Sequence, residues 1–228
     1  MGHKTNTVGV LYIVSTPIGH IRDITLRALD ILADADGIIC ESYRQASTLL
    51  KRLGIGSKEL FLLDEHDEAQ QTEDLLKMLL QGKRLALISD CGTPAFQDPG
   101  SRLIARCLEN RIPVKPFPGA SSLMAALSLS PMPIKGFFFL GFLPQKKAQR
   151  LREFQKLRKI QLPIILMDTP YRLGRLLTEV RDNLGGNRTV TLALDLTLPN
   201  ECIMHGKVHE VLSSVGDRKG EFILIVHN

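Results

Sequence analysis

Residues 10–19 have the sequence VLYIVSTPIG, an apolar run that ends in a turn of small and polar residues. The same arrangement recurs where Leu85–Ile88 leads into Ser89–Pro94 (SDCGTP) and where Pro113–Lys115 leads into Pro116–Ser122 (PFPGASS). In an open parallel sheet, such turns lie together at the carboxyl ends of the strands, where ligands bind. Small residues let the backbone approach a ligand, and hydroxyl groups with a carboxylate hold its polar parts. The three turns therefore predict one ligand site.

The first half of the chain alternates predicted strands and helices, which indicates a parallel sheet with helices on both faces. Asp23 is expected to cap a helix that carries Leu26, Leu29 and Leu32 on one face. The other expected helices cover residues 46–53, 69–81 and 102–109, and the expected strands cover 8–15, 37–40, 59–63, 84–89 and 114–117.

The second half has a different rhythm, which predicts a second lobe with a mixed sheet. Expected strands cover residues 136–143, 164–168, 189–195 and 222–226, expected helices cover 146–159 and 171–183, and residues 200–209 are expected to pair antiparallel. Proline and glycine concentrate at Phe117–Ser122. We therefore predict an α/β fold of two lobes, residues 1–117 and 118–228, with a cleft between them.

The composition of the chain is that of a globular protein and argues against a membrane-spanning or secreted one. The chain has 228 residues, 23% of them charged, and no apolar run approaches the roughly 18 residues of a membrane helix. Its polar start has no signal-peptide pattern, so we expect a cytoplasmic location without membrane association. The net charge of +5 is compatible with nucleic acid or with anionic small molecules. The four cysteines form no Cys-x-x-Cys pair and are expected to be reduced thiols.

Several familiar motifs are missing from the sequence. No G-x-G-x-x-G follows the first strand and no Walker A motif is present, which disfavours a dehydrogenase or a P-loop enzyme. His205 and His209 have the spacing of a helical metal pair, but no third ligand follows and Gly206 weakens a helix, so no metal site is predicted. His66, between acidic residues, is compatible with a substrate-side role or with an ordinary polar loop.

The turn motifs and their neighbours resemble the tetrapyrrole methylase family, in its ribosomal small subunit methyltransferase I branch. The matching segments occur in order over almost the whole chain and are Leu11–Gly19 with Asp23–Leu29, Ser89–Pro94 with Asp98–Gly100, Pro118–Ser122, Gly141–Pro144 with Lys146-Lys147, and Lys219–Phe222. The resemblance implies a homodimeric enzyme of two α/β lobes that holds S-adenosylmethionine in the cleft. It also implies methylation of the 2′-hydroxyl of a cytidine in 16S rRNA.

The resemblance also assigns expected roles to individual residues. The implied cofactor-binding residues are Pro17, Asp90, Thr93, Ser121 and Ser122 of the first three turns, with Met167 and Leu194 from the second lobe. Methyl transfer needs alignment of acceptor, methyl and sulfur, and a carboxylate near a ribose hydroxyl would help because that hydroxyl is a poor nucleophile. Our hypothesis is that Glu41 with Arg44 orients or activates the acceptor, while Asp90 anchors the cofactor.

Three segments depart from the branch pattern and leave the acceptor open. Glu41-Ser42-Tyr43-Arg44 stands for Glu-Asp-Thr-Arg, Asp168–Arg172 for Glu-Ser-Pro-His-Arg, and Asp195–Leu198 for Glu-Leu-Thr-Lys. Many branch members also continue into a helical extension beyond the last strand. The alternatives are C-methylation of a tetrapyrrole, which is a polyanion, and a non-catalytic RNA- or ribosome-binding factor that kept the fold.

A strongly basic segment occupies the predicted helix at residues 146–159. It carries Lys146, Lys147, Arg150, Arg152, Lys156, Arg158 and Lys159 against one acid, Glu153. Such a stripe would bind RNA phosphates, with a steep dependence on salt. A solvated helix face or a dimer contact explains it equally well.

Overall fold

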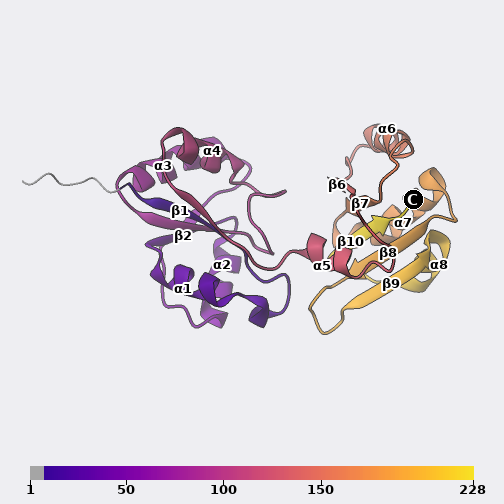
Figure 1. The fold of residues 1–228 in the computed structure, drawn as a ribbon, viewed down its shortest axis with the longest axis horizontal. Helices are drawn as coiled ribbons and strands as arrows, with labels where there is room; N and C mark the ends of the chain where they lie inside the picture. Colours follow the sequence, from indigo (N-terminus) through magenta and orange to yellow (C-terminus); the bar gives the residue numbers. More distant parts are fainter. Residues whose placement is uncertain (1–7) are drawn as a thin grey trace, which may run out of the picture. The chain divides into compact units, whose positions relative to one another are not determined.

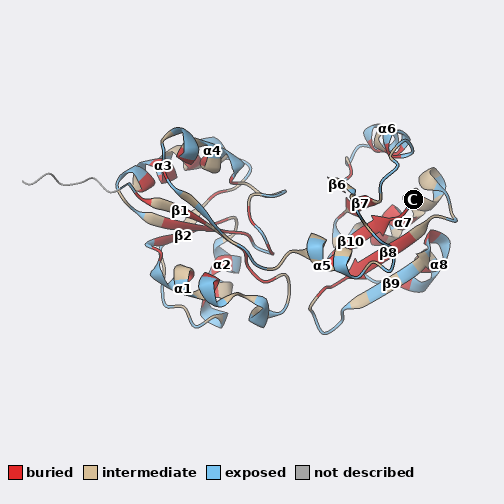
Figure 2. Ribbon diagram, in the orientation of Figure 1, coloured by how far each residue is buried: buried red, intermediate tan, exposed pale blue. Residues whose placement is uncertain are grey.

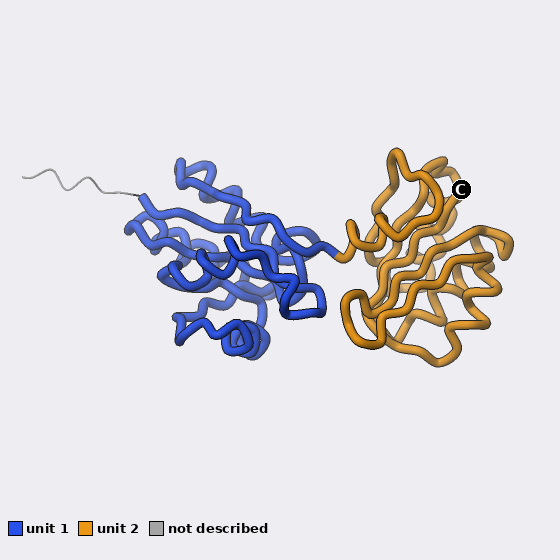
Figure 3. Tube along the Cα trace, turned by 60° about the horizontal axis from the view of Figure 1, so that its bottom comes forward, with its two compact units in different colours: residues 1–121 blue, residues 122–228 orange. Residues whose placement is uncertain are grey.

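The computed structural model describes residues 8–228, and it divides into two compact units, residues 1–121 and 122–228 (Figures 1 and 3). Unit 1 contains strands β1 (Val10–Val14), β2 (Gly37–Cys40), β3 (Leu60–Leu62), β4 (Arg84–Ile88) and β5 (Val114–Phe117), with helices α1 (Leu26–Asp34), α2 (Tyr43–Arg52), α3 (Glu68–Leu80) and α4 (Ser101–Glu109). A short 3-10 turn, η1 (Ile21–Asp23), precedes α1.

The sheet of unit 1 has the strand order β3-β2-β4-β1-β5, and all of its pairs are parallel. Successive side chains of a strand point to opposite faces, so the sheet divides its apolar residues between two cores. Leu85 and Leu87 of β4 pack with α3 and α4, whereas Ala86 and Ile88 pack with α1 and α2. Figure 1 shows the two helix pairs on opposite faces, which confirms the predicted parallel sheet covered on both sides.

Unit 2 is built around a mixed sheet. Its strands are β6 (Phe138–Phe142), β7 (Ile164–Met167), β8 (Thr189–Leu194), β9 (Cys202–Lys207) and β10 (Phe222–Val226), and its helices are α5 (Ser122–Ser128), α6 (Lys147–Leu157), α7 (Leu173–Leu184) and α8 (Val208–Val215), with a 3-10 turn η2 (Pro170–Arg172). The strand order is β6-β7-β10-β8-β9, in which only β6 and β7 are parallel. The antiparallel pairing expected for residues 200–209 is confirmed by β8 and β9.

Buried residues of unit 2 concentrate in its central strands and in the helix faces against them (Figure 2). Phe154 of α6, Leu176 of α7 and Val211 of α8 share one core with alternate residues of the sheet. Leu224, at the centre of β10, is fully buried in that core. In the part of the chain that the structure describes, no helix has the length and apolar character needed to cross a membrane.

The first helix begins at a different residue from the predicted one. Asp23 lies in the 3-10 turn η1, and Thr25 is the N-cap of α1, where its Oγ1 accepts a hydrogen bond of 3.1 Å from the Ala28 N–H. The prediction of Asp23 as the cap is therefore wrong. A threonine hydroxyl at the N-cap accepts a hydrogen bond from a free N–H of the first turn, which is the role that the prediction gave to the Asp23 carboxylate.

Candidate functional site

The first two turns are tied together at the carboxyl edge of the parallel sheet. Thr16 follows β1, and its Oγ1 donates to the Ser89 carbonyl oxygen at 3.0 Å, just beyond β4. The same hydroxyl accepts from the Gly92 N–H at 3.1 Å, and the Thr16 N–H donates to the Gly92 carbonyl oxygen at 2.8 Å. Because Thr16 is buried, these bonds fix the relative position of the two turns.

The third turn, which follows β5, packs against the same edge. Gly119 lies so close to β1 that an added Cβ would stand 2.9 Å from the Ser15 Cβ, closer than ordinary carbon contact permits. Thr93 Oγ1 lies 3.1 Å from Ser15 Oγ and donates to the Ala120 carbonyl oxygen at 3.3 Å. The structure therefore brings together all three turns that the sequence singled out.

The second turn continues into a loop with unusual backbone conformations. Gly92 has a φ of +86°, which costs a glycine little because it has no Cβ. Ala95 and Gln97 also have positive φ angles, of 64° and 67°, which non-glycine residues rarely adopt. Strain of this kind is often found in loops that serve a binding site.

Three carboxyl groups, Glu41 after β2, Asp90 after β4 and Asp98 in the strained loop, share this edge of the sheet. Burial, and then the nearby charges of Asp98, Asp90 and Glu65, raise the pKa of Glu41 to about 7. Burial and Asp98 raise the pKa of Asp90, and burial raises that of Asp98. None of the three carboxylates forms an ion pair with any residue from 8 to 228. The site is thus suited to a ligand with positive charge.

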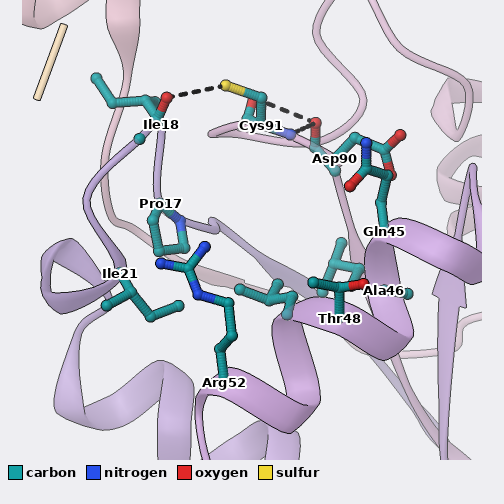
Figure 4. A pocket seen from close by; sticks show the side chains of 13 residues that line it. Pro17, Ile18, Ile21, Gln45, Ala46, Thr48, Arg52, Asp90 and Cys91 are labelled. Carbon is teal, nitrogen blue, oxygen red and sulfur yellow. Dashed lines mark hydrogen bonds between the residues drawn. The ribbon is translucent and has the colours of Figure 1, made fainter. Parts of the chain in front are cut away.

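A pocket of about 160 Å³ opens beside the first two turns (Figure 4). Pro17, Ile18, Gly19 and Ile21 line it from the first turn and η1, Ile88, Ser89, Asp90 and Cys91 from β4 and the second turn, and Gln45, Ala46, Thr48, Leu49 and Arg52 from α2. Figure 4 shows the Gln45 and Asp90 side chains next to each other and Arg52 extending from α2 toward Pro17. Its lining is mixed, with the aliphatic side chains of Ile21, Leu49 and Ile88 beside the polar side chains of Gln45, Thr48 and Arg52.

The residues expected to act in unit 1 occupy distinct positions. Pro17 and Asp90 both line the pocket, whereas Thr93 lies at the junction of the three turns. Glu41 is half-buried directly after β2, and Arg44 is exposed in the first turn of α2. In the described chain no ion pair joins Glu41 to Arg44.

The remaining expected cofactor residues belong to later segments. Ser121 and Ser122 are half-buried, at the end of unit 1 and the beginning of α5. Met167 is half-buried at the end of β7. The Leu194 side chain is 2% exposed and packs in the core of unit 2.

Arg150 was expected to belong to the exposed basic stripe of residues 146–159, and for this residue the prediction is wrong. Its side chain is 3% exposed, so it cannot contact RNA phosphates. Its Nη2 donates to Asp168 Oδ2 at 2.7 Å and its Nε to Glu179 Oε2 at 2.6 Å. The ion pair therefore joins α6 to the end of β7 and to α7. The other cationic residues of the segment, Lys146, Lys147, Arg152, Lys156, Arg158 and Lys159, are exposed.

Asp195 directly follows β8, in one of the segments that depart from the branch pattern. Like Arg150, it forms hydrogen bonds within unit 2. It is 6% exposed with a φ of 50°, its N–H donates to the Glu221 carbonyl oxygen at 2.8 Å, and its Oδ1 accepts from the Glu221 N–H at 3.0 Å. Asn200 Nδ2 donates to its other carboxylate oxygen. A Cβ at Gly220 would overlap this carboxylate, so Asp195 connects β8 with the start of β10.

The histidines do not form a metal site in the described part of the chain. His205 lies in β9 and His209 in α8, and no group of three or more metal-ligating side chains occurs among residues 8–228. His66 is exposed, and its N–H donates to Asp64 Oδ1 at 2.9 Å, as in a polar loop.

Sequence reasoning missed three polar residues of the pocket, Gln45, Thr48 and Arg52. Their spacing of three and four residues places them on one face of α2. This spacing in the sequence predicts that the three residues share a helix face, but it does not predict that this face borders a pocket.

Comparisons with known proteins agree with this arrangement. The family described as Tetrapyrrole (Corrin/Porphyrin) Methylases matches residues 10–212. The chain is 39% identical over 226 residues to the Ribosomal RNA small subunit methyltransferase I of Vibrio cholerae, covering 97% of this chain and 78% of that protein. It is 37% identical over 221 residues to the protein of the same name from Leptospira biflexa, covering 96% and 91% of the two chains.

Solved structures share the fold. The uroporphyrin III C-methyl transferase of Thermus thermophilus superimposes with a TM-score of 0.67 at 16% identity, over 96% of this chain and 98% of that one. A structure of that transferase complexed with S-adenosyl homocysteine gives a TM-score of 0.68 at 17% identity, over 96% and 98%. The chain therefore belongs to the tetrapyrrole methylase family, in which it is a methyltransferase of the ribosomal RNA small subunit methyltransferase I branch.

Proposed function

We propose that the chain transfers a methyl group from S-adenosylmethionine to the 2′-hydroxyl of a cytidine ribose in 16S rRNA. The observation that carries this proposal is the 37–40% identity, over 96–97% of the chain, to relatives named Ribosomal RNA small subunit methyltransferase I. Two of the three departures from the branch pattern, those that begin at Asp168 and Asp195, weigh less against the proposal, because both carboxylates are buried in contacts internal to unit 2.

The carboxyl edge of the parallel sheet has the chemistry that this cofactor requires. S-adenosylmethionine carries a sulfonium and an ammonium group, and when bound it supplies the methyl group. Asp90 and Asp98 provide negative charge without an ion pair among residues 8–228, and Asp90 is exposed to accept hydrogen bonds. Pro17, Thr93, Ser121 and Ser122 are the further residues proposed to hold the cofactor, with Met167 and Leu194 from unit 2.

Glu41 is the residue proposed to act on the acceptor. A general base works best when its pKa lies near the working pH, and the pKa of Glu41 is raised to about 7. In this proposal Glu41 accepts the proton of the ribose hydroxyl, and Arg44, exposed in the first turn of α2, holds the acceptor strand through a phosphate. Asp90 orients the cofactor, so that both reactants are aligned.

The first experiment is transfer of labelled methyl from S-adenosylmethionine to purified 30S subunits that lack their native methylations, with uroporphyrinogen as the alternative acceptor. We expect label in a 16S rRNA ribose and none in the tetrapyrrole. Label only in the tetrapyrrole would contradict the proposed acceptor. Cofactor binding without any methyl transfer would favour the non-catalytic binding factor instead.

Glu41→Gln and Arg44→Gln test the assigned roles in the same assay. We expect Glu41→Gln to lower kcat by about 10²–10⁴-fold, the usual contribution of a general base, with cofactor affinity unchanged. Full turnover with wild-type cofactor affinity would exclude Glu41 from the acceptor step.

A homodimer in the cytoplasm is the remaining part of the proposal, which the family resemblance supports. Leu129, Met132 and Phe142 are large apolar side chains exposed on unit 2, at 42%, 38% and 48%, and contact with a second copy would remove them from water. Sedimentation equilibrium of the purified chain distinguishes a dimer from the 25.4 kDa monomer.

A further inference from the structure

We infer that the pocket between α2 and the first two turns binds one unstacked pyrimidine nucleotide of the RNA acceptor. The inference rests on the proposed function, because it names the part of the RNA that this site receives. Its three supports are the size of the pocket, the polar side chains on one face of α2, and the unpaired guanidinium of Arg52.

The size of the pocket suits one six-membered ring. Its volume of about 160 Å³ is close to the ~150 Å³ of an apolar protein cavity that holds one benzene molecule. Ile21, Leu49 and Ile88 provide aliphatic walls against which a flat ring can pack. A purine, with its second fused ring, needs more room. Proteins that read RNA sequence commonly take up single bases that have left the stack, so one such base matches this cavity.

The polar groups suit the edge of a base. Gln45 presents a carboxamide, which offers both a donor and an acceptor, and its side chain has no hydrogen bond with residues 8–228. Thr48 Oγ1 donates to the Arg44 carbonyl oxygen at 2.8 Å, which leaves its lone pairs available to a donor in the ligand. A pyrimidine presents adjacent donors and acceptors of this kind on its pairing edge.

Arg52 supplies positive charge at the rim of the pocket. Within residues 8–228 its guanidinium has no ion pair or hydrogen bond, whereas Arg84 and Arg106 of the same unit are paired with carboxylates. Figure 4 shows its side chain extending toward Pro17, across the pocket from Gln45. A guanidinium binds phosphate through two parallel N–H groups, so Arg52 is placed to hold the phosphate of a nucleotide whose base is in the pocket.

The position of the pocket also fits the chemistry. Pro17 and Asp90 belong both to its lining and to the residues proposed to hold the cofactor. A nucleotide bound here would therefore be a direct neighbour of the methyl donor, as a ribose acceptor must be. The competing occupant is the cofactor itself, and the experiment separates the two.

The test measures binding of cytidine 5′-monophosphate and adenosine 5′-monophosphate to the full chain saturated with S-adenosylhomocysteine. We expect the cytidine nucleotide to bind at least 10-fold more tightly than the adenosine nucleotide, and Arg52→Gln to weaken its binding at least 10-fold. Lys51→Gln is the matched control, because Lys51 is the preceding exposed cation of α2 and does not line the pocket. It should change the affinity less than 2-fold.

Three results would overturn the inference: equal affinity for the two nucleotides, equal effects of Arg52→Gln and Lys51→Gln, or competition between S-adenosylhomocysteine and cytidine 5′-monophosphate. Gln45→Ala is the second variant, and it should raise KM for 30S subunits several-fold without altering cofactor affinity. If subunits are methylated but the nucleotide results fail, the proposed function stands and the pocket assignment falls. If the nucleotide results hold and no subunit is methylated, the assignment of 16S rRNA falls instead.

Discussion

Removing the Arg150 guanidinium should destabilise unit 2 far more than removing a charge from the surface of α6. The Arg150 and Asp168 side chains are 3% and 2% exposed, and their polar atoms are 2.7 Å apart. In Arg150→Met the buried Asp168 keeps its hydrogen bond from the Thr169 N–H and the more distant Arg172, 3.6 Å away. Breaking a buried pair by removing one partner costs about 3–5 kcal/mol, and we expect that loss here.

The double variant makes the prediction sharper. Asp168→Asn in the Arg150→Met background removes the orphaned charge, so the double variant should be more stable than Arg150→Met alone. Glu179 does not repeat the problem, because Arg175 pairs with it at 3.0 Å. Arg152→Met, an exposed cation on the same helix, is the control and should change the free energy of unfolding by no more than about 0.5 kcal/mol.

Urea unfolding is the assay, since urea does not screen charge. The chain has no tryptophan, so far-UV circular dichroism follows the transition, and hydrogen exchange of β7 and α7 amides reports on unit 2 separately. Two units can unfold in two steps, and the effect should be confined to the step of unit 2. A loss below about 1 kcal/mol in Arg150→Met, or a double variant no more stable than it, would refute the reasoning.

Three shorter predictions follow from other parts of the molecule. Because the pKa of Glu41 is about 7, the methylation rate should rise with pH through about 7 as this carboxyl loses its proton, and a Glu41→Gln profile that still rises would contradict the base role. Burial lowers the pKa of His227 below its ordinary value of 6.5, so the unfolded chain binds that proton more readily. The free energy of unfolding should then fall as pH falls below about 6.5, and His227→Asn should reduce that slope in urea titrations at pH 7.5 and 5.5. Gly220→Ala should cost about 1–3 kcal/mol by thermal or urea unfolding because its methyl group overlaps the Asp195 carboxylate, whereas Gly174→Ala, in open space on α7, should be neutral or stabilising.

Strands with continuous apolar runs were predictable from sequence. Gly37–Cys40 and Phe222–Val226 agree with the structure residue for residue. Runs of this kind, bounded by glycine, proline or charged residues, are typical of strands buried inside a sheet. Together with the alternation of strands and helices, they were enough to indicate two α/β lobes.

Helix α8 was missed for a physical reason. Val208–Val215 contains three valines, which favour strands, and it follows β9 directly, with Lys207 as its N-cap in place of a serine, threonine or aspartate. Its stability comes from packing, because Val208, Val211 and Val215 are all buried against the sheet. Such tertiary contacts override local preference and are not visible in the local sequence.

The candidate site was only partly predictable. The three turns were predictable from their composition, because a close approach of backbone segments requires small residues such as Gly119. The pocket depends instead on which face of α2 meets the first turn, and the burial of Arg150 depends on partners 18 and 29 residues away in the sequence. Contacts over such separations are set by the fold as a whole.

The central place of β10 in the sheet of unit 2 determines the order in which the two units can form during synthesis. Every strand of the unit 1 sheet lies before residue 118, so that sheet can close while most of unit 2 is still being translated. The sheet of unit 2 lacks the strand between β7 and β8 until residues 222–226 leave the ribosome. During that interval the edges of β7 and β8 that later pair with β10 are unpaired. A nascent chain stalled before β10 would therefore expose apolar strands that chaperones bind.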